Sequence, residues 1–367
     1  MSIHYGPRVS AEELSQGQRQ GTRVVIDVTP LTRPGSDRGL GRYMKTVLSA
    51  VDREHFRVLT FSMPTRRGRT QQVRDLLDRQ RRLKHLDYDI FHAPNPYMGI
   101  VYTSGRNVVS VLDLIPLDIS DYRRLGFNAN LFLKRLTSRA DRVLALSHFT
   151  AERIMDLLDI DKDKIVVASL PPADTFFPRS DGTAEEWLRT LGVRRPYVMA
   201  MADGRIYDPR KRNEWLPAVG RRLKQSGSQL VVAGPESYRL FDAGSHVITV
   251  GRVGDAELAQ LMASAQAFVF PSAYEGQGMP PLEAMACGTP VVAMRNTAIP
   301  EVVGRGGILV DERPHGAQTA VEELADACIE LTRDEDERDR LGQLALKQSS
   351  SFTLSTFSAA LSHAYLD

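Results

Sequence analysis

Short apolar runs alternate with longer amphipathic segments along most of the chain. The runs are rich in residues that favour strands, and the clearest of them are 23–30, 57–62, 141–147, 164–169, 196–203, 267–272 and 290–294. Strands that are buried on both faces are continuously apolar, whereas a helix that covers a sheet keeps one polar face. The alternation therefore predicts an α/β fold built on parallel sheets.

A Pro-rich and polar stretch, 170–186, interrupts this alternation near the middle of the chain. Linkers between domains have such a composition, and 367 residues are enough for two domains with separate cores. We therefore predict two Rossmann-like domains, an N-terminal one over 22–178 and a C-terminal one over 179–351. Residues 1–21 are polar and Gln-rich, and we interpret them as an N-terminal extension.

The stretch 267–294 has the pattern of a strand, a glycine loop, a short helix and a second strand. Pro280 suits the first turn of the helix, and Gly288 suits its end. Strand ends of an open α/β sheet face a ligand crevice, where the free N–H groups of a loop and a helix N-terminus favour anions such as phosphate. Gly276 and Gly278 allow the backbone to approach such a ligand closely.

Two carboxylates stand in this stretch, Glu275 in the loop and Glu283 in the helix, with seven residues between them. Carboxylates accept hydrogen bonds from hydroxyl groups, so the pair suits a polyol that carries phosphate between its two ends, as a nucleotide sugar does. The alternative is that both are solvated surface residues, which is usual for an isolated Glu. The apolar neighbours Leu282 and Ala284 favour the functional interpretation of Glu283.

Two further loops have groups that suit a phosphate. Gly39 and Gly41 follow the first predicted strand and precede a helix, which is an arrangement that cradles phosphate, although glycines alone are a weak signal. The loop after strand 196–203 is basic, and its candidate residues are Arg205, Arg210 and Lys211. Fixed positive charge stabilises a diphosphate leaving group as its bond to a sugar breaks, and a basic loop in solvent is the alternative.

Two polar residues stand at the ends of predicted strands in the first domain, His92 and Asp113. Ligands bind at the carboxyl ends of such strands, so both are candidates for the acceptor side of the cleft. The alternatives are that His92 is hydrogen-bonded in the core and that Asp113 caps the turn that follows it.

Composition excludes several classes of function. The net charge is +2, which gives no overall attraction to nucleic acid. Cys287 and Cys328 lie in apolar helical patterns and indicate buried thiols rather than a disulfide framework or a zinc site. No apolar run is long enough to span a membrane, and the N-terminus lacks the apolar core of a signal peptide, so we expect a cytoplasmic protein.

The segment 65–85 is dense in arginine and has an apolar face, so part of it is predicted to be an amphipathic helix. Most charge runs of this kind are solvated helix faces, and we favour that interpretation slightly. A peripheral contact with the anionic inner face of a membrane, which would suit a lipid-linked acceptor, is the second interpretation. A subsite for an anionic acceptor is the third.

The central stretch, PSAYEGQGMPPLEAMACGTPVVA over 271–293, resembles the retaining glycosyltransferases of family 4, which have the GT-B fold. The resemblance extends from residue 22 to the C-terminus and is strongest over 200–311. It implies two Rossmann-like domains that face each other across a cleft, with the nucleotide sugar on the C-terminal domain and the acceptor on the N-terminal one. It also implies that a last helix, 352–367, crosses back to pack on the N-terminal domain.

The resemblance assigns roles to the candidate residues. It implies that Glu275 contacts the transferred sugar and that Glu283 holds the ribose hydroxyls. The backbone of Gly276, Gln277, Gly278 and Met279 is implied to bind sugar and phosphate.

The resemblance extends to the basic loop and the other predicted donor loops. GR followed by PRK looks like the phosphate-binding pair of the family, which makes Arg205 and Lys211 the predicted catalytic cations and Arg210 a further donor contact. The loop with Gly39 and Gly41 is similar to the loop that faces the diphosphate, and Arg252 and Val253 match the loop that holds the base.

Two positions depart from the family pattern. Members commonly have Phe where this chain has Gln277, and they often have His where this chain has Leu112, directly before Asp113. These departures leave the shape of the sugar pocket open. The segments IDVTPL, RGLGRY, HAPN and DLIPL are similar to a mannosyltransferase branch that uses GDP-mannose, which is a hint about the donor.

The predicted reaction is transfer of a sugar from a GDP-, UDP- or ADP-sugar to an acceptor hydroxyl with retention of configuration, and mannose is one option for the sugar. The expected role is in the biosynthesis of a glycan, a polysaccharide or a glycosylated metabolite. We expect no metal and no cofactor, because basic residues supply the charge, and no protein nucleophile. One alternative is a non-catalytic protein that binds a nucleotide sugar. The other is a nicotinamide-dependent oxidoreductase, which the absence of a G-x-G-x-x-G motif after the first strand disfavours.

Overall fold

The structure is a computed structural model, and it describes residues 21–32, 39–63, 69–98, 104–119, 133–179, 184–312 and 316–367. The predicted extension 1–21, apart from Gly21, and the beginning of the basic segment 65–85 lie outside these residues.

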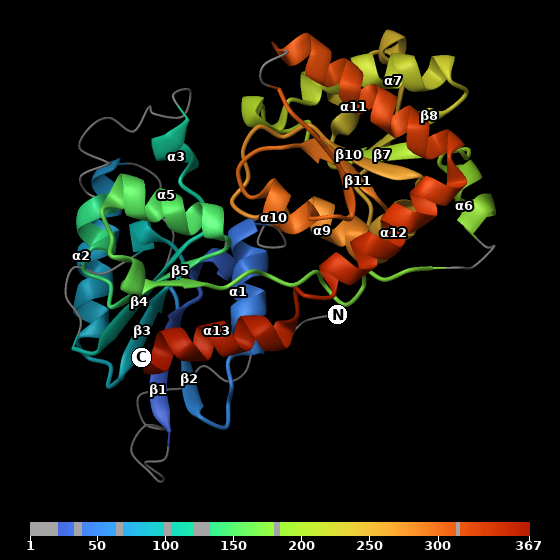
Figure 1. The fold of residues 1–367 in the computed structure, drawn as a ribbon. Helices are drawn as coiled ribbons and strands as arrows, with labels where there is room; N and C mark the ends of the chain where they lie inside the picture. The colour runs from blue at the N-terminus through green and yellow to red at the C-terminus, as the bar shows by residue number, and fades with distance from the viewer. Residues whose placement is uncertain are drawn as a thin grey trace.

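The described residues form two parallel sheets of six strands each, joined by the segment that follows β6 (Figure 1). The N-terminal sheet has the order β2-β1-β3-β4-β5-β6, with β1 (Thr22–Asp27), β2 (Phe56–Phe61), β3 (Ile90–Ala93), β4 (Arg106–Val111), β5 (Arg142–Ala145) and β6 (Ile165–Val167). The C-terminal sheet has the order β12-β11-β10-β7-β8-β9, with β7 (Tyr197–Met201), β8 (Gln229–Ala233), β9 (Val247–Gly251), β10 (Ala267–Phe270), β11 (Val291–Met294) and β12 (Gly307–Val310). This is the predicted α/β architecture, two Rossmann-like halves of a GT-B fold.

Helices cover both faces of each sheet (Figure 1). Those of the N-terminal half are α1 (Gly39–Ala50), α2 (Arg69–Leu83), α3 (Ile115–Asp118) and α5 (His148–Leu158). Those that follow are α6 (Ala184–Thr190), α7 (Leu216–Gln225), α8 (Asp255–Ser264), α9 (Met279–Ala286), α10 (Ile299–Val303), α11 (Gly316–Arg333), α12 (Glu335–Ser349) and α13 (Leu354–Leu366).

Each sheet is buried on both faces, which explains why its strands are continuously apolar. Val24 and Ile26 of β1 pack into one apolar cluster, and Val25 between them packs into another on the opposite face. In β7, Met199 and its neighbour Val198 divide in the same way between two clusters. The alternation follows from the period of two residues in a strand.

The last helix, α13, crosses back to the N-terminal half of the molecule (Figure 1). Phe357, Leu361 and Tyr365 of α13 share an apolar cluster with Tyr43 and Met44 of α1. The helix thereby supports α1, which is one wall of the site described below.

His92 is fully buried beneath α13, so the prediction that it lies on the acceptor side of the cleft is wrong. Its Nδ1 is 2.7 Å from the Tyr365 hydroxyl, and its Nε2 is 2.7 Å from Ser110 Oγ, which also contacts the Tyr43 hydroxyl at 2.6 Å. Burial lowers the pKa of His92 to about 3, so the ring is neutral. His92 therefore belongs to a buried polar chain that joins β3, β4, α1 and α13.

The described part of the basic segment has both buried and exposed charges. Arg79 of α2 is buried, and its Nε forms an ion pair of 2.9 Å with Asp27 at the end of β1. Arg74, Arg81 and Arg82 are exposed. Among the described arginines of the segment, Arg79 is therefore structural, and the exposed ones are compatible with both a solvated face and a contact with an anionic surface.

Candidate active site

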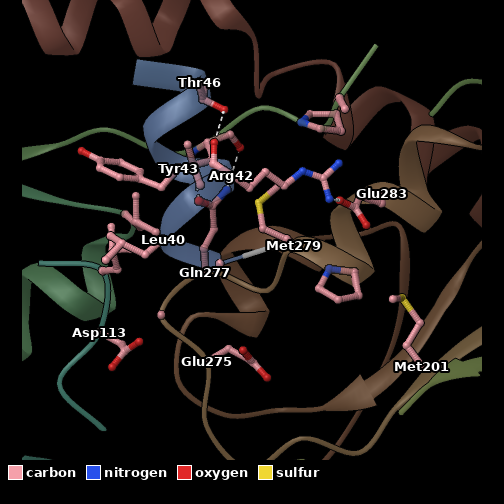
Figure 2. A pocket seen from close by; sticks show the side chains of 18 of the residues that line it. Leu40, Arg42, Tyr43, Thr46, Asp113, Met201, Glu275, Gln277, Met279 and Glu283 are labelled. Atoms are coloured by element: carbon pink, nitrogen blue, oxygen red, sulfur yellow. Dashed lines mark hydrogen bonds and ion pairs between the residues drawn. The ribbon is translucent and has the colours of Figure 1, made fainter. Parts of the chain in front are cut away.

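A cavity of about 1810 Å³ lies between the two halves of the molecule (Figure 2). Predicted site residues of both domains line it: Gly39, Asp113, Arg210, Lys211, Arg252, Val253, Glu275, Gly276, Gln277, Met279 and Glu283. The structure therefore brings to one cavity residues that are far apart in the sequence.

Four predicted residues are absent from the described lining, His92, Gly41, Gly278 and Arg205. Gly41 is buried within α1. Gly278 precedes α9 with a φ of +100°, and a Cβ there would lie 2.7 Å from Ile299 Cδ1. The positive φ favours glycine at this position, and a Cβ would in addition require the end of the Ile299 side chain to shift.

Glu275 is held in the loop between β10 and α9 by three hydrogen-bond donors. Its Oε1 lies 2.6 Å from Lys211 Nζ, 3.1 Å from Arg210 Nη1 and 2.6 Å from Ser272 Oγ. Glu275 is 9 % exposed, and burial alone would raise its pKa, but the charges of Lys211 and Arg210 outweigh burial and lower it. Glu275 is therefore an ionised acceptor of hydrogen bonds at neutral pH.

The two cations come from a short 3-10 helix, Pro209–Lys211, in the loop that follows β7. Arg210 is fixed further by the carbonyl oxygen of Tyr274, which accepts its Nη1–H at 3.0 Å, and by Asp208, whose Oδ2 is 3.1 Å from its Nε. Arg210 and Lys211 thus present two positive charges to the cavity from a rigid position.

Arg205 has a different environment. Its guanidinium donates to both carboxylate oxygens of Asp203, at 2.9 and 2.7 Å. A phosphate contact would require the side chain to rotate away from Asp203, so the role of Arg205 stays a prediction. Arg210 is the described arginine that accompanies Lys211 on Glu275.

Asp113 reaches the cavity from the N-terminal domain, near Glu275 (Figure 2). Burial raises its pKa, the charge of Glu275 adds to this, and Arg210 and Lys211 oppose it. Asp113 Oδ1 also accepts the backbone N–H of Ile115 at 3.2 Å. The carboxylates of the two domains therefore share one electrostatic environment with the two cations.

Glu283 lies in α9, at the other side of the cavity in Figure 2, and is 2 % exposed. Its Oε1 is 2.6 Å from Nη1 of Arg42 in α1, so the ion pair bridges the two domains. Burial raises the pKa of Glu283 to about 7; Arg42 lowers it and Asp255 raises it. The sequence did not indicate this pair, because its members lie in different domains.

The loop with Glu275 also touches the N-terminal domain directly. The Gly276 carbonyl accepts hydrogen bonds from Ser147 Oγ at 2.6 Å and Thr150 Oγ1 at 3.1 Å. A Cβ at Gly276 would lie 2.0 Å from the Leu112 carbonyl oxygen. Gly276 is therefore required for the close approach of the two domains.

Gln277, where the family commonly has Phe, binds the interdomain segment. Its Oε1 accepts the Leu170 N–H at 2.9 Å, and its Nε2 donates to the Leu170 carbonyl at 2.8 Å. Both functional groups of the amide are satisfied by one backbone unit, so the side chain fixes the loop against the N-terminal domain.

Glu301 of α10 is a further contact between the domains. Its carboxylate accepts the backbone N–H groups of His148 at 2.8 Å and Phe149 at 2.6 Å, in the first turn of α5. A negative charge at this end of a helix is favoured by the free N–H groups and the helix dipole. Sequence reasoning missed the contact because helix and carboxylate are about 150 residues apart.

Two family models match the chain. Residues 198–334 match the family described as glycosyl transferases group 1, and residues 6–171 match the glycosyl transferase 4-like domain. The chain is 30% identical over 244 residues to the O-antigen chain mannosyltransferase B of Escherichia coli. The aligned region covers 61% of this chain and 61% of that relative. It is also 30% identical over 257 residues to the D-inositol 3-phosphate glycosyltransferase of Corynebacterium glutamicum, covering 64% of this chain and 59% of the relative. These matches span less than two thirds of either curated relative.

Solved structures share the fold. The sucrose-phosphate synthase of Thermosynechococcus elongatus matches with a TM-score of 0.72 and 18% identity, over 94% of this chain and 98% of that one. HepE of Anabaena, in complex with UDP and glucose, matches with a TM-score of 0.68 and 19% identity, over 94% and 99%.

The raised pKa of Glu283 generates a prediction on stability. The pKa of Glu283 in the folded protein, about 7, lies above the ordinary value of 4.5, so folding favours the protonated carboxyl. The stability that this protonation contributes is complete below pH 4.5 and is lost as the pH rises through about 7. Glu283→Gln retains the neutral form. We expect its unfolding free energy, relative to the natural protein, to increase between pH 5 and pH 8 by on the order of 2 kcal/mol.

Denaturant titrations of both proteins at several pH values measure this difference. Glu323→Gln, on the exposed face of α11, is the matched control and should show no such gain. A difference between Glu283→Gln and the natural protein that stays constant with pH would contradict the prediction.

Proposed function

The chain belongs to the GT-B glycosyltransferases of family 4, and from that membership we propose that it is an enzyme that transfers a sugar from a nucleotide diphosphate donor to an acceptor hydroxyl with retention of configuration. The observation that carries the proposal is the convergence of Glu275, Lys211 and Arg210 on one side of the cavity, with Glu283 on the other. The two carboxylates lie on either side of a space in the cavity. The charges of Lys211 and Arg210 and the N–H groups at the start of α9 make this space favourable for phosphate.

The diphosphate would lie between these acids. The N–H groups at the start of α9 and of the loop before it favour an anion, and Lys211 and Arg210 add fixed charge. As the bond between sugar and phosphate breaks, negative charge develops on the leaving phosphate, and cations already in place stabilise that charge without reorganising. These residues supply the charge that catalysis needs, so we propose that the reaction requires no metal and no cofactor.

Glu275 would bind the hydroxyl groups of the transferred sugar. Its lowered pKa keeps it ionised, and an ionised carboxylate forms strong hydrogen bonds with hydroxyl donors. When the diphosphate takes part of the charge of Lys211 and Arg210, the sugar hydroxyls compensate the buried carboxylate. We assign Glu275 a positioning role toward the sugar and assign no protein nucleophile, because the leaving phosphate accepts the proton of the acceptor.

The acceptor would approach from the side of Asp113. This carboxylate lines the cavity opposite the C-terminal domain, where a hydroxyl directed at the donor sugar can donate to it. Leu112 stands directly before Asp113, where the family often has His, and a leucine side chain can neither donate nor accept a hydrogen bond there.

We propose mannose as the transferred sugar. Several relatives are named as mannosyltransferases, including O-antigen chain mannosyltransferase B. Arg252 and Val253, which line the cavity, would hold the base through backbone groups, and such contacts do not distinguish guanine, uracil and adenine by side-chain type.

A lipid-linked acceptor and a peripheral membrane contact through 65–85 complete the proposal. The outer surface of α2 presents Arg74, Arg81 and the exposed Leu77, which suits an anionic and partly apolar surface. In the part of the chain that the structure describes, no helix has both the length and the apolar character needed to cross a bilayer.

A thermal-shift panel tests the proposed function. We expect one nucleoside diphosphate and its sugars to raise the melting temperature, and the other two of UDP, GDP and ADP to leave it unchanged. A ligand at about 100 times its Kd stabilises the folded protein by about 2.7 kcal/mol, which produces the shift. The mannosyltransferase relatives lead us to expect the GDP series. A protein that responds to none of them, and is stabilised by a nicotinamide dinucleotide instead, would contradict the proposal.

Glu275→Ala should separate transfer from diphosphate binding. We expect the rate of transfer to fall by about 10²-fold or more, while the affinity for the nucleoside diphosphate stays equal or increases, because Lys211 and Arg210 lose their competing partner.

Lys211→Ala should instead weaken diphosphate binding by about tenfold. Calorimetry and a transfer assay measure both effects, with Glu214→Ala, an exposed neighbour, as control. Equal loss of transfer and of diphosphate affinity in Glu275→Ala would show that Glu275 is misassigned.

A further inference from the structure

Arg42 and Glu283 form an ion pair that neither residue completes. Arg42 Nη1 lies 2.6 Å from Glu283 Oε1, but this contact is an ion pair without the geometry of a hydrogen bond. Among the described residues, neither Glu283 Oε1 nor Arg42 Nη2 has a hydrogen-bond partner. Glu283 is 2 % exposed, and the Arg42 side chain is 27 % exposed. Buried charges that lack hydrogen bonds are costly, and a buried ion pair does not by itself stabilise a protein strongly.

The surroundings of the pair supply little further compensation. The Arg42 guanidinium lies 5.7 Å from the centre of the Phe176 ring in the interdomain segment, and this contact is weaker than a hydrogen bond to an anion. Asp255 is close enough to raise the pKa of Glu283, which makes the carboxylate charge less favourable. Both members of the pair line the cavity (Figure 2), so a ligand can reach them.

A nucleoside diphosphate has the two kinds of group that this pair lacks. Ribose hydroxyls donate hydrogen bonds to a carboxylate, and phosphate oxygens accept them from a guanidinium in a bidentate arrangement. Arg42 stands one turn after Gly39, at the start of α1, so its side chain crosses the cavity from the N-terminal domain to α9. Redirecting the guanidinium within the cavity would require rotation about the side-chain bonds of Arg42.

We propose that Arg42 competes with the donor ribose for Glu283 and, when the ribose binds, transfers its guanidinium to the diphosphate. This inference rests on the proposed function. Arg42 thereby makes occupation of the ribose site and of the diphosphate site interdependent. A nucleoside without phosphate has to displace Arg42 from Glu283 and gives it no new partner, whereas a nucleoside diphosphate supplies one. The residue therefore selects for donors that carry both groups.

The proposal predicts opposite effects of one substitution on two ligands. Arg42→Ala should increase the affinity for the nucleoside, because Glu283 is then free for the ribose. It should decrease the affinity for the nucleoside diphosphate, because the phosphates lose a cation. We expect the ratio of the two affinities to change by about tenfold or more, which corresponds to one lost hydrogen bond between charged groups.

The measurement is titration calorimetry or ligand-observed NMR at pH 8.5, with the nucleoside and the diphosphate of whichever base stabilises the natural protein. Arg42→Lys, which keeps the charge, should retain most of the diphosphate affinity. Arg53→Ala removes one exposed positive charge from the loop after α1 and should change neither affinity. In Glu283→Gln, the further change Arg42→Ala should no longer improve nucleoside binding.

Three outcomes overturn the proposal: equal weakening of both ligands by Arg42→Ala, no effect on either, or improved nucleoside binding that persists in Glu283→Gln. If Arg42→Ala does not fold, Arg42→Lys and Arg42→Gln replace it. A changed ratio of nucleoside affinity to diphosphate affinity in Arg42→Gln, but not in Arg42→Lys, supports the exchange. Equal ratios in the two variants contradict it. If the natural protein binds no nucleoside diphosphate, the proposed function fails as well. If it binds one and the Arg42 variants do not alter the ratio, only this inference fails.

Discussion

The site depends on one requirement, that the buried charge of Glu275 be neutralised. A carboxylate with so little exposure is stable only if donors surround it, and two of its three side-chain donors come from the loop after β7. Strands β7 and β10 are parallel neighbours, so the loops that follow them emerge at the same edge of the sheet. The sheet topology thus brings residues 64 positions apart into contact and gives the cavity its charge.

The second requirement is that the two domains meet at the same loop. Gly276 and Gln277, which directly follow Glu275, are hydrogen-bonded to Ser147, Thr150 and Leu170 of the N-terminal side. The loop that carries the buried acid is therefore fixed from both domains. A change in the angle between the domains would therefore have to break these hydrogen bonds or move the backbone beside Glu275.

The sequence predicted what depends on local pattern. Apolar runs located the strands, and the glycine loop followed by Pro280 located the start of α9, because burial on both faces and helix capping leave signals within a few residues. Contacts between distant segments left no such signal. His92 stands at a strand end, as a ligand-binding residue would, but a helix 273 residues later covers it. The partners of Gln277 and Glu301 likewise belong to the other domain, and neither spacing nor composition identifies them.

The central claim is that one donor molecule contacts both domains at once, and hydrogen exchange followed by mass spectrometry tests it most directly. With the nucleotide sugar that stabilises the protein bound at saturation, the backbone amides at the start of α1 and those from Gly276 into α9 should both exchange more slowly than in the free protein. Protection confined to the C-terminal domain, with α1 unchanged, would contradict a donor site shared between the domains.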